Sequence, residues 1–255
     1  MSESVRAVER ALDVLMCFTS QTPELTMSQI SELIGINKST VHRLLATLEG
    51  KRFVERDPLS GVYRPGVRLL QMAFLTRDHN NLRRLVTPLL HELSSQYREN
   101  VNLSVLDEAF VVYMDVIESP QRVKLAAVPG QRLPAFCTAS GKSILAFLPI
   151  DIVQHILENG MPRYTCNTII AKEEYFEDML VVKERGFATS EQEFEDGINA
   201  VAAPILNGSG KPIASISIAG PAFRLTRDRM IEIGPELVSQ IKNFSHEVEL
   251  VVNPE

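Results

Sequence analysis

Two short helical stretches joined through a glycine, near the start of the chain, constrain its fold more than any other feature. Residues 26–29 read Thr-Met-Ser-Gln and match a capping box, in which two side chains satisfy backbone N–H groups reciprocally. Gly35 stands where the chain leaves this helix, a position that favours a left-handed residue. Asn37 is a good N-cap for a second helix over 38–50. The pattern predicts a helix-turn-helix.

The second of these helices has the composition of a DNA-reading helix. Its apolar residues recur at positions 41, 44, 45 and 48 and form one face, while Ser31 and Val41 allow the two helices to pack closely. Arg43 could pair bidentately with a guanine in the major groove, since arginine side chains commonly do so. A solvated polar face on an interaction domain is the alternative. The predicted DNA-binding residues of this helix are Lys38, Ser39, Thr40, His42 and Arg43.

Residues 53–56 and 61–64 alternate around a turn and predict a β-hairpin, which would form a wing after the helix-turn-helix. Arg56 and Arg64 on this wing are candidate contacts to phosphates or to the minor groove, although each can equally lie in solvent. Ahead of the helix-turn-helix in the chain, apolar residues at helical spacing from Val5 predict another helix, of about four turns.

Residues 67–75 are apolar on nearly every side of a helix. Such a helix must be covered all round, and one short N-terminal domain cannot cover it. We therefore expect a partner subunit, that is, a homodimer.

A net charge of −6 disfavours a nucleic-acid partner when taken alone, but the charge is unevenly distributed along the chain. Through Arg84 the chain has 12 Lys and Arg against 9 Asp and Glu, whereas the remainder has 14 against 23. A mildly basic N-terminal part followed by an acidic remainder is typical of a DNA-binding domain fused to a domain that does not touch DNA.

The remaining chain mixes strands and helices, which indicates an α+β domain. We expect a helix over 82–93 that is interrupted or restarted at Pro88, and a C-terminal helix from Thr226 with a break at Gly234-Pro235. The other predicted elements are a strand pair over 101–106 and 110–117, helices near 140–147, 151–158 and 173–185, and a second strand pair over 199–206 and 212–218.

Several features that suggest catalysis or cofactors do not withstand inspection. Gly141-Lys142-Ser143 resembles the end of a P-loop, but Phe136 stands where that motif needs a glycine. Ser140 lacks the surroundings of a nucleophile elbow. The acidic run 191–196 reads as a solvated loop more readily than as paired catalytic carboxylates. We therefore expect no catalytic residues and no cofactor.

The composition of the chain limits where the protein is located and what it binds. No apolar run approaches the roughly 20 residues that span a bilayer, and the first residues are too charged for a signal peptide. Cys17, Cys137 and Cys166 are far apart and match no disulfide framework or zinc spacing. These observations predict a cytoplasmic protein with reduced thiols, no metal site and no membrane partner.

Six segments, taken in order, resemble the IclR family of transcriptional regulators along nearly the whole chain. They are SVRAVERAL (4–12), KSTVHRLL (38–45), VNLSVLD (101–107), TASGK (138–142), GINAVAAP (197–204) and SISIAGP (215–221). The resemblance implies a winged helix-turn-helix domain over 1–66, a linker helix over 67–80, and an effector-binding domain related to GAF and PAS sensors over 81–255. It also implies dimers that can pair into tetramers and that bind palindromic promoter DNA.

The resemblance also implies where an effector binds. The segment at 138–142 would line the pocket, where small side chains let a ligand carboxylate approach backbone N–H groups; a small-residue helix start packed in a core is the alternative. Only the beginning of the acidic run would lie beside the effector. The implied effector-binding residues are Leu125, Thr138, Ala139, Ser140, Ser190, Glu193, Ala200, Ser217 and Ala219.

Two of these positions bear on specificity. Family members often have a cysteine at the position of Ala200 and a serine at that of Ala219. The pocket of this chain is therefore expected to be more apolar than that of relatives that bind very small hydrophilic acids. We expect a small carboxylate that is aromatic or branched, and larger than glyoxylate. Two other functions stay open at this point: an enzyme acting on a small carboxylate, and an architectural DNA-binding protein without an effector.

Overall fold

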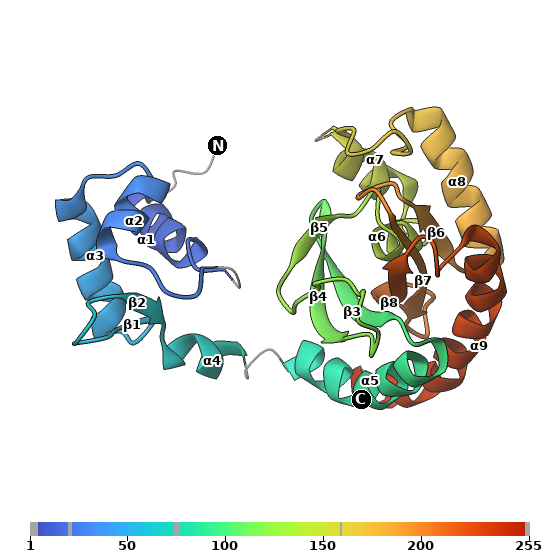
Figure 1. The fold of residues 1–255 in the computed structure, drawn as a ribbon, viewed down its shortest axis with the longest axis horizontal. Helices are drawn as coiled ribbons and strands as arrows, with labels where there is room; N and C mark the ends of the chain where they lie inside the picture. The colour runs from blue at the N-terminus through green and yellow to red at the C-terminus, as the bar shows by residue number, and fades with distance from the viewer. Residues whose placement is uncertain (1–4, 20–21, 74–76, 159, 253–255) are drawn as a thin grey trace. The chain divides into compact units, whose positions relative to one another are not determined.

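The computed structural model describes residues 5–19, 22–73, 77–158 and 160–252. The chain divides into two compact units, Met1–Arg77 and Asp78–Glu255 (Figure 1). Each unit has its own hydrophobic core, as two separate domains require.

The first unit is a winged helix-turn-helix, as the sequence predicts. Helices α1 (Arg6–Met16), α2 (Met27–Leu33) and α3 (Lys38–Gly50) precede strands β1 (Val54–Arg56) and β2 (Tyr63–Pro65), which pair antiparallel, and α4 (Val67–Ala73) follows. The first helix has 11 residues, three turns instead of the predicted four. Fully buried Val14, Ile30, Val41 and Leu45 form the centre of the core.

The predicted caps are present and fix the geometry of the helix pair. Thr26 and Gln29 form the capping box at the start of α2. Gly35 has a φ of 65°, in the left-handed region, and turns the chain toward α3. The side chain of Asn37 accepts a hydrogen bond from the Thr40 N–H at 2.9 Å. Ser31 tightens the turn by donating from its hydroxyl to the Ile36 carbonyl oxygen at 2.5 Å.

Apolar side chains remain exposed on two helices of this unit. Val5, Val8, Leu12 and Met16 lie at helical spacing along α1 and its N-cap, and all four are more than half exposed. None of the residues in α4 is buried, and Leu70 and Met72 are prominent among its exposed side chains. Within the described residues of one chain, neither face is covered. The last two residues of the predicted apolar segment, 74–75, lie outside the described residues.

The second unit is built on a six-stranded antiparallel sheet. The strand order is β5-β4-β3-β8-β7-β6. The central strands are β3 (Asn100–Asp107), β8 (Pro212–Pro221), β4 (Phe110–Ile117) and β7 (Ile198–Leu206). The short edge strands β5 (Arg132–Pro134) and β6 (Ala188–Glu191) were not predicted, because three or four residues show no clear alternation.

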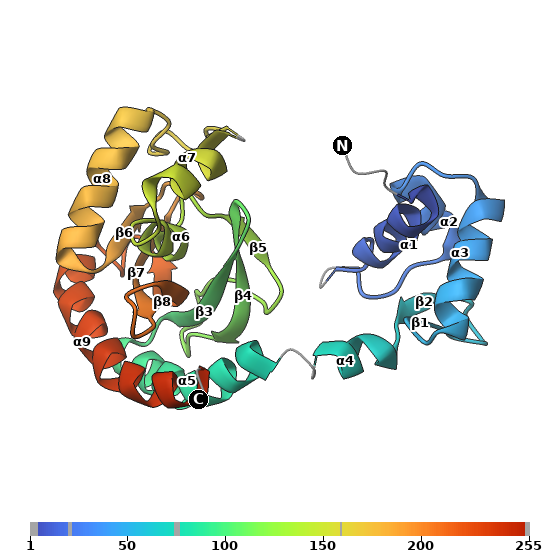
Figure 2. The ribbon, with the colours of Figure 1, turned by 180° about the vertical axis from the view of Figure 1, so that it is seen from behind.

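Helices cover both faces of this sheet. Helices α5 (Arg77–Tyr97) and α9 (Arg227–Val252) lie side by side on one face, as Figures 1 and 2 show from opposite sides. Helices α6 (Ala139–Leu145), α7 (Ile150–Glu158) and α8 (Lys172–Arg185) belong to the other side. Alternate residues of each strand serve the two faces: Ile216 and Ile218 pack in the α5/α9 core, whereas Ser217 between them faces the opposite side.

Two predicted helix breaks are wrong. Helix α5 continues through Pro88 and α9 continues through Pro235. Each proline removes one N–H donor from its helix, but both prolines and the residues four positions earlier, Arg84 and Ile231, are exposed. The carbonyl groups that lose their partners can therefore bond to water, which makes an internal proline tolerable.

Three further observations concern the described residues. The cysteines are free, with Cys137 buried and Cys166 exposed. No cluster of three or more histidine, cysteine or acidic side chains within the described ranges has a geometry that could hold a metal ion. Among the described helices, none combines the length and apolar character needed to cross a membrane.

Candidate functional site

The N-terminal half of α3 presents hydrogen-bonding side chains to solvent. Lys38, Ser39, His42 and Arg43 are exposed, and Thr40 is half-buried. The opposite side of the helix, with Val41 and Leu45, is anchored in the core. The structure thus brings the five predicted residues of this helix together on one accessible surface, which is the arrangement needed to enter a major groove.

The wing places its two arginines differently. Arg56 is exposed, and its guanidinium lies 5.8 Å from the centre of the Tyr63 ring. Arg64 forms an exposed ion pair with Glu55 of the neighbouring strand, at 3.4 Å between Nη2 and Oε2. An exposed pair of this kind contributes little stability, so Arg64 can exchange Glu55 for a phosphate at small cost.

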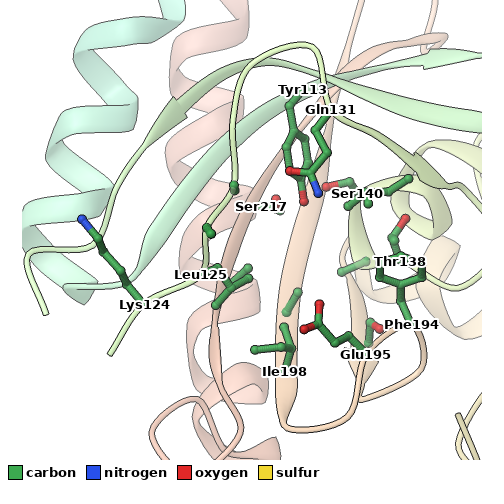
Figure 3. A pocket seen from close by; sticks show the side chains of 17 residues that line it. Tyr113, Lys124, Leu125, Gln131, Thr138, Ser140, Phe194, Glu195, Ile198 and Ser217 are labelled. Carbon is green, nitrogen blue, oxygen red and sulfur yellow. The ribbon is translucent and has the colours of Figure 1, made fainter. Parts of the chain in front are cut away.

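A cavity of about 340 Å³ lies in the second unit, between the sheet and the segments that carry Leu125 and Thr138 (Figure 3). It contains eight of the nine predicted effector-binding residues. These are Leu125, Thr138, Ala139, Ser140, Ser190, Ala200, Ser217 and Ala219.

The other residues that line this cavity were not predicted from the sequence. Tyr113 comes from β4 and Gln131 from the segment before β5, and in Figure 3 their polar ends face the interior. The alternation of β4 could have indicated that Tyr113 shares a face with the cavity, but not which face that is. The remaining unpredicted lining residues are Lys124, Ala126, Ala127, Leu133, Phe194, Glu195 and Ile198.

Several neutral hydrogen-bond donors of the cavity are unused. The Tyr113 hydroxyl and the Ser140 hydroxyl form no hydrogen bond with the described residues. Burial raises the pKa of Tyr113 to about 12, so its phenol remains a proton donor at neutral pH. Ser217 Oγ accepts a hydrogen bond from Asn102 Nδ2 at 3.3 Å, which leaves the Ser217 hydrogen free to be donated.

Two other polar residues of the cavity wall are already engaged. Ser190 donates from its hydroxyl to the Cys137 carbonyl oxygen at 3.1 Å. Thr138 caps α6: its Oγ1 accepts from the Gly141 N–H at 3.3 Å and donates to the Pro134 carbonyl oxygen at 2.9 Å. These two residues shape the wall more than they offer free groups to a ligand.

Charged groups stand at the edge of the cavity. Lys124 is the one ammonium group among the described lining residues, but it pairs with Glu118 and points away from the interior in Figure 3. Glu195 is exposed and contributes a carboxylate to the lining. The interior therefore offers hydroxyl and amide donors between apolar walls.

Glu193 does not line this cavity, and the interpretation of its segment as a solvated loop is wrong at this residue. Its side chain is buried, and Oε1 accepts from Lys142 Nζ at 2.7 Å. Burial raises the pKa of Glu193, and the Lys142 ammonium opposes that rise. The acidic run 191–196 gives no local sign of a cation buried 51 residues earlier in the chain. The same burial removes Lys142 from any phosphate-binding role.

Together, a helix-turn-helix with an accessible α3 and a separate domain with a ligand-sized cavity are the two parts expected of a DNA-binding transcriptional regulator. Two family models match the chain: "Bacterial transcriptional regulator IclR C-terminal" over residues 74–248 and "IclR helix-turn-helix domain" over residues 7–58. The chain belongs to the IclR family of transcriptional regulators, and the members it matches are regulators and not enzymes.

Individual relatives agree with this assignment. The chain is 30% identical to the HTH-type transcriptional regulator KipR of Bacillus subtilis, over 97% of both chains. It is 33% identical to the HTH-type transcriptional regulator XynR of Escherichia coli, over 84% of this chain and 86% of XynR. A solved structure of an IclR homolog from Microbacterium hydrocarbonoxydans, complexed with 4-hydroxybenzoate, has the same fold with a TM-score of 0.84. That protein is 23% identical, and the match covers 94% of this chain and 99% of the homolog.

Proposed function

We propose that this regulator reads promoter DNA with the exposed face of α3 and responds to a small organic acid held in the cavity of its second unit. Bases in the major groove would be read by Ser39, Thr40, His42 and Arg43, with Lys38 on the backbone. Arg56 and Arg64 of the wing would fix the position of the protein by contacting phosphates. The domain boundaries predicted from the sequence, 1–66, 67–80 and 81–255, remain part of this proposal. We also propose that the protein acts in the cytoplasm, where the chromosome is accessible.

The effector that fits the cavity best is an aromatic or branched carboxylate. The observation that carries this proposal is the combination of free neutral donors at Tyr113, Ser140 and Ser217 with apolar walls at Leu125 and Ala200. The donors can bind a carboxylate, and about 340 Å³ exceeds the needs of a two-carbon acid. A protein of the same fold is described in complex with 4-hydroxybenzoate.

The protein would act as a homodimer, which can pair into a tetramer, on a palindromic site. The exposed apolar faces of α1 and α4 support this proposal, because apolar patches that stay uncovered in one chain mark interaction surfaces. Two-fold symmetry of the protein matches two-fold symmetry of the DNA. An effector then changes DNA affinity only if it binds the DNA-bound and free arrangements with different affinities.

Effector binding is tested by thermal denaturation with 4-hydroxybenzoate, 3-methyl-2-oxobutanoate and glyoxylate. A ligand at about 100 times its Kd should stabilise the folded protein by about 2.7 kcal/mol. We expect stabilisation by one of the two larger acids. Stabilisation by glyoxylate alone would contradict the proposed effector class. A footprint on the intergenic DNA next to the gene of this protein, with and without the acid, shows whether the bound acid alters promoter binding.

DNA reading is tested by Arg43→Ala in binding assays on the footprinted site. If Arg43 contacts a base bidentately, specific binding should weaken by about 1–3 kcal/mol and the base preference at that position should relax. Glu49→Gln, at an exposed position near the other end of α3, is the control and should leave base preference unchanged. Unaltered affinity and preference in Arg43→Ala would remove Arg43 from the reading surface.

A further inference from the structure

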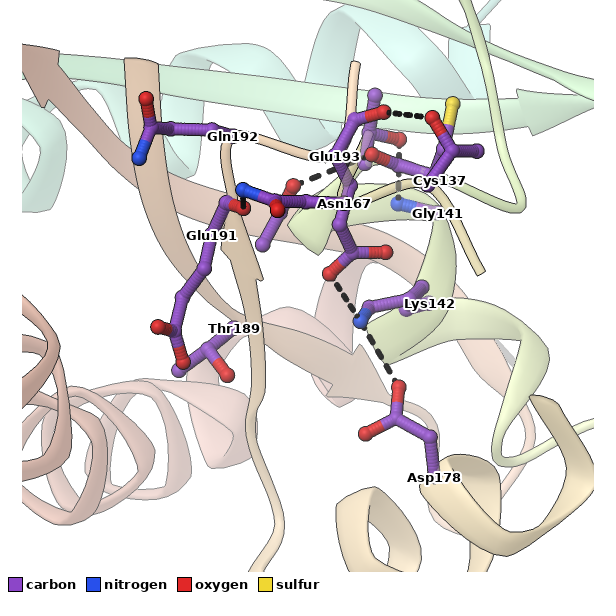
Figure 4. Close-up of polar contacts among 12 residues, drawn as sticks. Cys137, Gly141, Lys142, Asn167, Asp178, Thr189, Glu191, Gln192 and Glu193 are labelled. Carbon is purple, nitrogen blue, oxygen red and sulfur yellow. Dashed lines mark hydrogen bonds and ion pairs between the residues drawn. The ribbon is translucent and has the colours of Figure 1, made fainter. Parts of the chain in front are cut away.

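Lys142 lies inside the second unit, and its side chain is 2% exposed. A buried ammonium group is costly unless opposite charges surround it. Lys142 Nζ lies 2.7 Å from Glu193 Oε1 and 2.8 Å from Asp178 Oδ2 (Figure 4). We refer to Lys142, Glu193 and Asp178 as the buried ion cluster. Neither DNA reading nor the free donors of the cavity involve this cluster.

The cluster joins three segments that are far apart in the sequence. Lys142 belongs to α6, whose first residues, Ala139 and Ser140, line the cavity. Asp178 belongs to α8 on the outside of the unit. Glu193 lies between β6 and β7, directly before two cavity residues, Phe194 and Glu195. One ammonium group therefore connects two walls of the cavity to an outer helix.

The backbone around Glu193 is held as firmly as its side chain. The Thr165 hydroxyl donates to the Gln192 carbonyl oxygen at 2.6 Å, and the Thr168 hydroxyl donates to the Glu193 carbonyl oxygen at 2.7 Å. Gln192 has a φ of 58°, in the left-handed region, so the chain turns sharply just before Glu193. A non-glycine residue keeps such a conformation only where its surroundings impose it.

Phe194 is fixed from a second direction. Its ring lies 5.0 Å, centre to centre, from the ring of Tyr164, which in turn lies 6.1 Å from the ring of Phe136. Tyr164 directly precedes Thr165 in the chain, so one irregular segment contacts both the backbone of Glu193 and the side chain of Phe194. The ion pair between Glu193 and Lys142 joins this assembly to α6.

We infer that Lys142 is a positioning residue of the effector cavity: by holding Glu193 it sets the places of Phe194 and Glu195 on the cavity wall. This inference rests on the proposed function of the cavity. It assigns to the Gly-Lys-Ser segment a role within the protein interior. It also makes α8, through Asp178, sensitive to any movement of that wall.

The test compares Glu193→Gln with Glu191→Gln in the full-length protein. Glu193→Gln removes the charge that faces Lys142 but leaves the ammonium paired with Asp178, so the variant should fold. Glu191 is two residues earlier; it forms an exposed pair with Arg227 at 3.3 Å, and its carboxylate points away from Lys142 in Figure 4. The same substitution at Glu191 therefore controls for the change in composition. Lys142→Met is the second test variant.

The first measurement needs no ligand. Hydrogen–deuterium exchange, followed by mass spectrometry, should be faster over residues 192–197 in Glu193→Gln and Lys142→Met than in wild type and Glu191→Gln. Exchange in the helix-turn-helix unit should not change. Equal exchange over residues 192–197 in all folded variants would overturn the inference.

The second measurement is the affinity for 4-hydroxybenzoate. Glu193→Gln should weaken binding by about tenfold, whereas Glu191→Gln should bind as wild type does. A lower melting temperature with unchanged affinity and exchange would assign Lys142 a purely structural role. If wild type does not bind 4-hydroxybenzoate, that acid is wrong as an effector, and the exchange measurement still decides whether Lys142 positions the wall.

Discussion

At the scale of single residues, Tyr113 shows how burial keeps a hydrogen-bond donor protonated and neutral. Its phenol is almost fully buried, and burial raises its pKa to about 12. Because the pKa is higher in the folded than in the unfolded protein, the neutral phenol contributes stability below about pH 10, and this contribution is lost as the pH rises through 12. At neutral pH the hydroxyl is therefore always available to an anion.

We predict that Tyr113→Phe weakens binding of the effector carboxylate by roughly tenfold or more, because a hydrogen bond to a charged group is worth about 1.5–3 kcal/mol. Isothermal titration calorimetry measures this loss. Tyr97→Phe is the control: Tyr97 donates to Glu236 Oε2 at 2.6 Å, between α5 and α9, and does not line the cavity. Equal losses in the two variants would mean that Tyr113 acts only through stability.

At the scale of elements, Gly234 explains how α9 can lie so close to the sheet layer. A Cβ atom at this position would stand 2.3 Å from a ring carbon of Phe187. Gly234, which the sequence predicts as part of a helix break, is thus a site of close packing. The ring of Phe187 occupies the space that any larger residue would need.

Gly234→Ala should destabilise the second unit by about 1–3 kcal/mol, because the added methyl group forces the Phe187 ring to move. Chemical denaturation monitored by circular dichroism gives the free energy of unfolding. The matched variant is Gly50→Ala at the end of α3, where a Cβ atom meets nothing within 4 Å. We expect no loss there, and a gain of up to about 1 kcal/mol from helix propensity. Wild-type stability in Gly234→Ala would contradict the packing argument.

The elements were predictable where local chemistry determines them. Capping by Thr26 and Asn37 and the left-handed turn at Gly35 depend on neighbouring residues, so the helix-turn-helix could be predicted in detail. Whether a proline ends a helix depends on solvent at the carbonyl group four residues earlier. That is a tertiary property, and it explains the errors at Pro88 and Pro235.

The candidate site was predictable to a similar limit. Ala200, Ser217 and Ala219 line the cavity, as the family resemblance implies for their segments. Tyr113 was missed because the sequence does not say which face of β4 is inside. Glu193 was misread because its partner, Lys142, comes from another element, and pairing between distant segments leaves no local pattern.

At the scale of the whole molecule, the exposed apolar row along α1 is a feature that a single chain does not explain. Val5, Val8, Leu12 and Met16 present a continuous apolar row, although α1 packs on α3 through its other side. A second copy of the chain would bury such a row and recover the hydrophobic free energy that exposure forgoes.

We predict that the double substitution Val8→Glu and Leu12→Glu breaks the oligomer into a smaller assembly, because it places carboxylates in an apolar interface. The molecular mass in solution should therefore fall. Sedimentation equilibrium measures the mass. Leu59→Glu is the control, since Leu59 is 97% exposed at the tip of the wing and stands alone. An unchanged mass in the double variant would show that α1 is not part of the subunit interface.

The alternation of the central strands has a consequence for how such regulators diversify. Along β8, Ile216 and Ile218 belong to the helical core, whereas Ser217 and Ala219 face the cavity. Substitutions at Ser217 or Ala219 can alter ligand preference while Ile216 and Ile218, which pack in the helical core, stay the same. New specificities can therefore accumulate in a lineage one strand position at a time, without passing through unfolded intermediates.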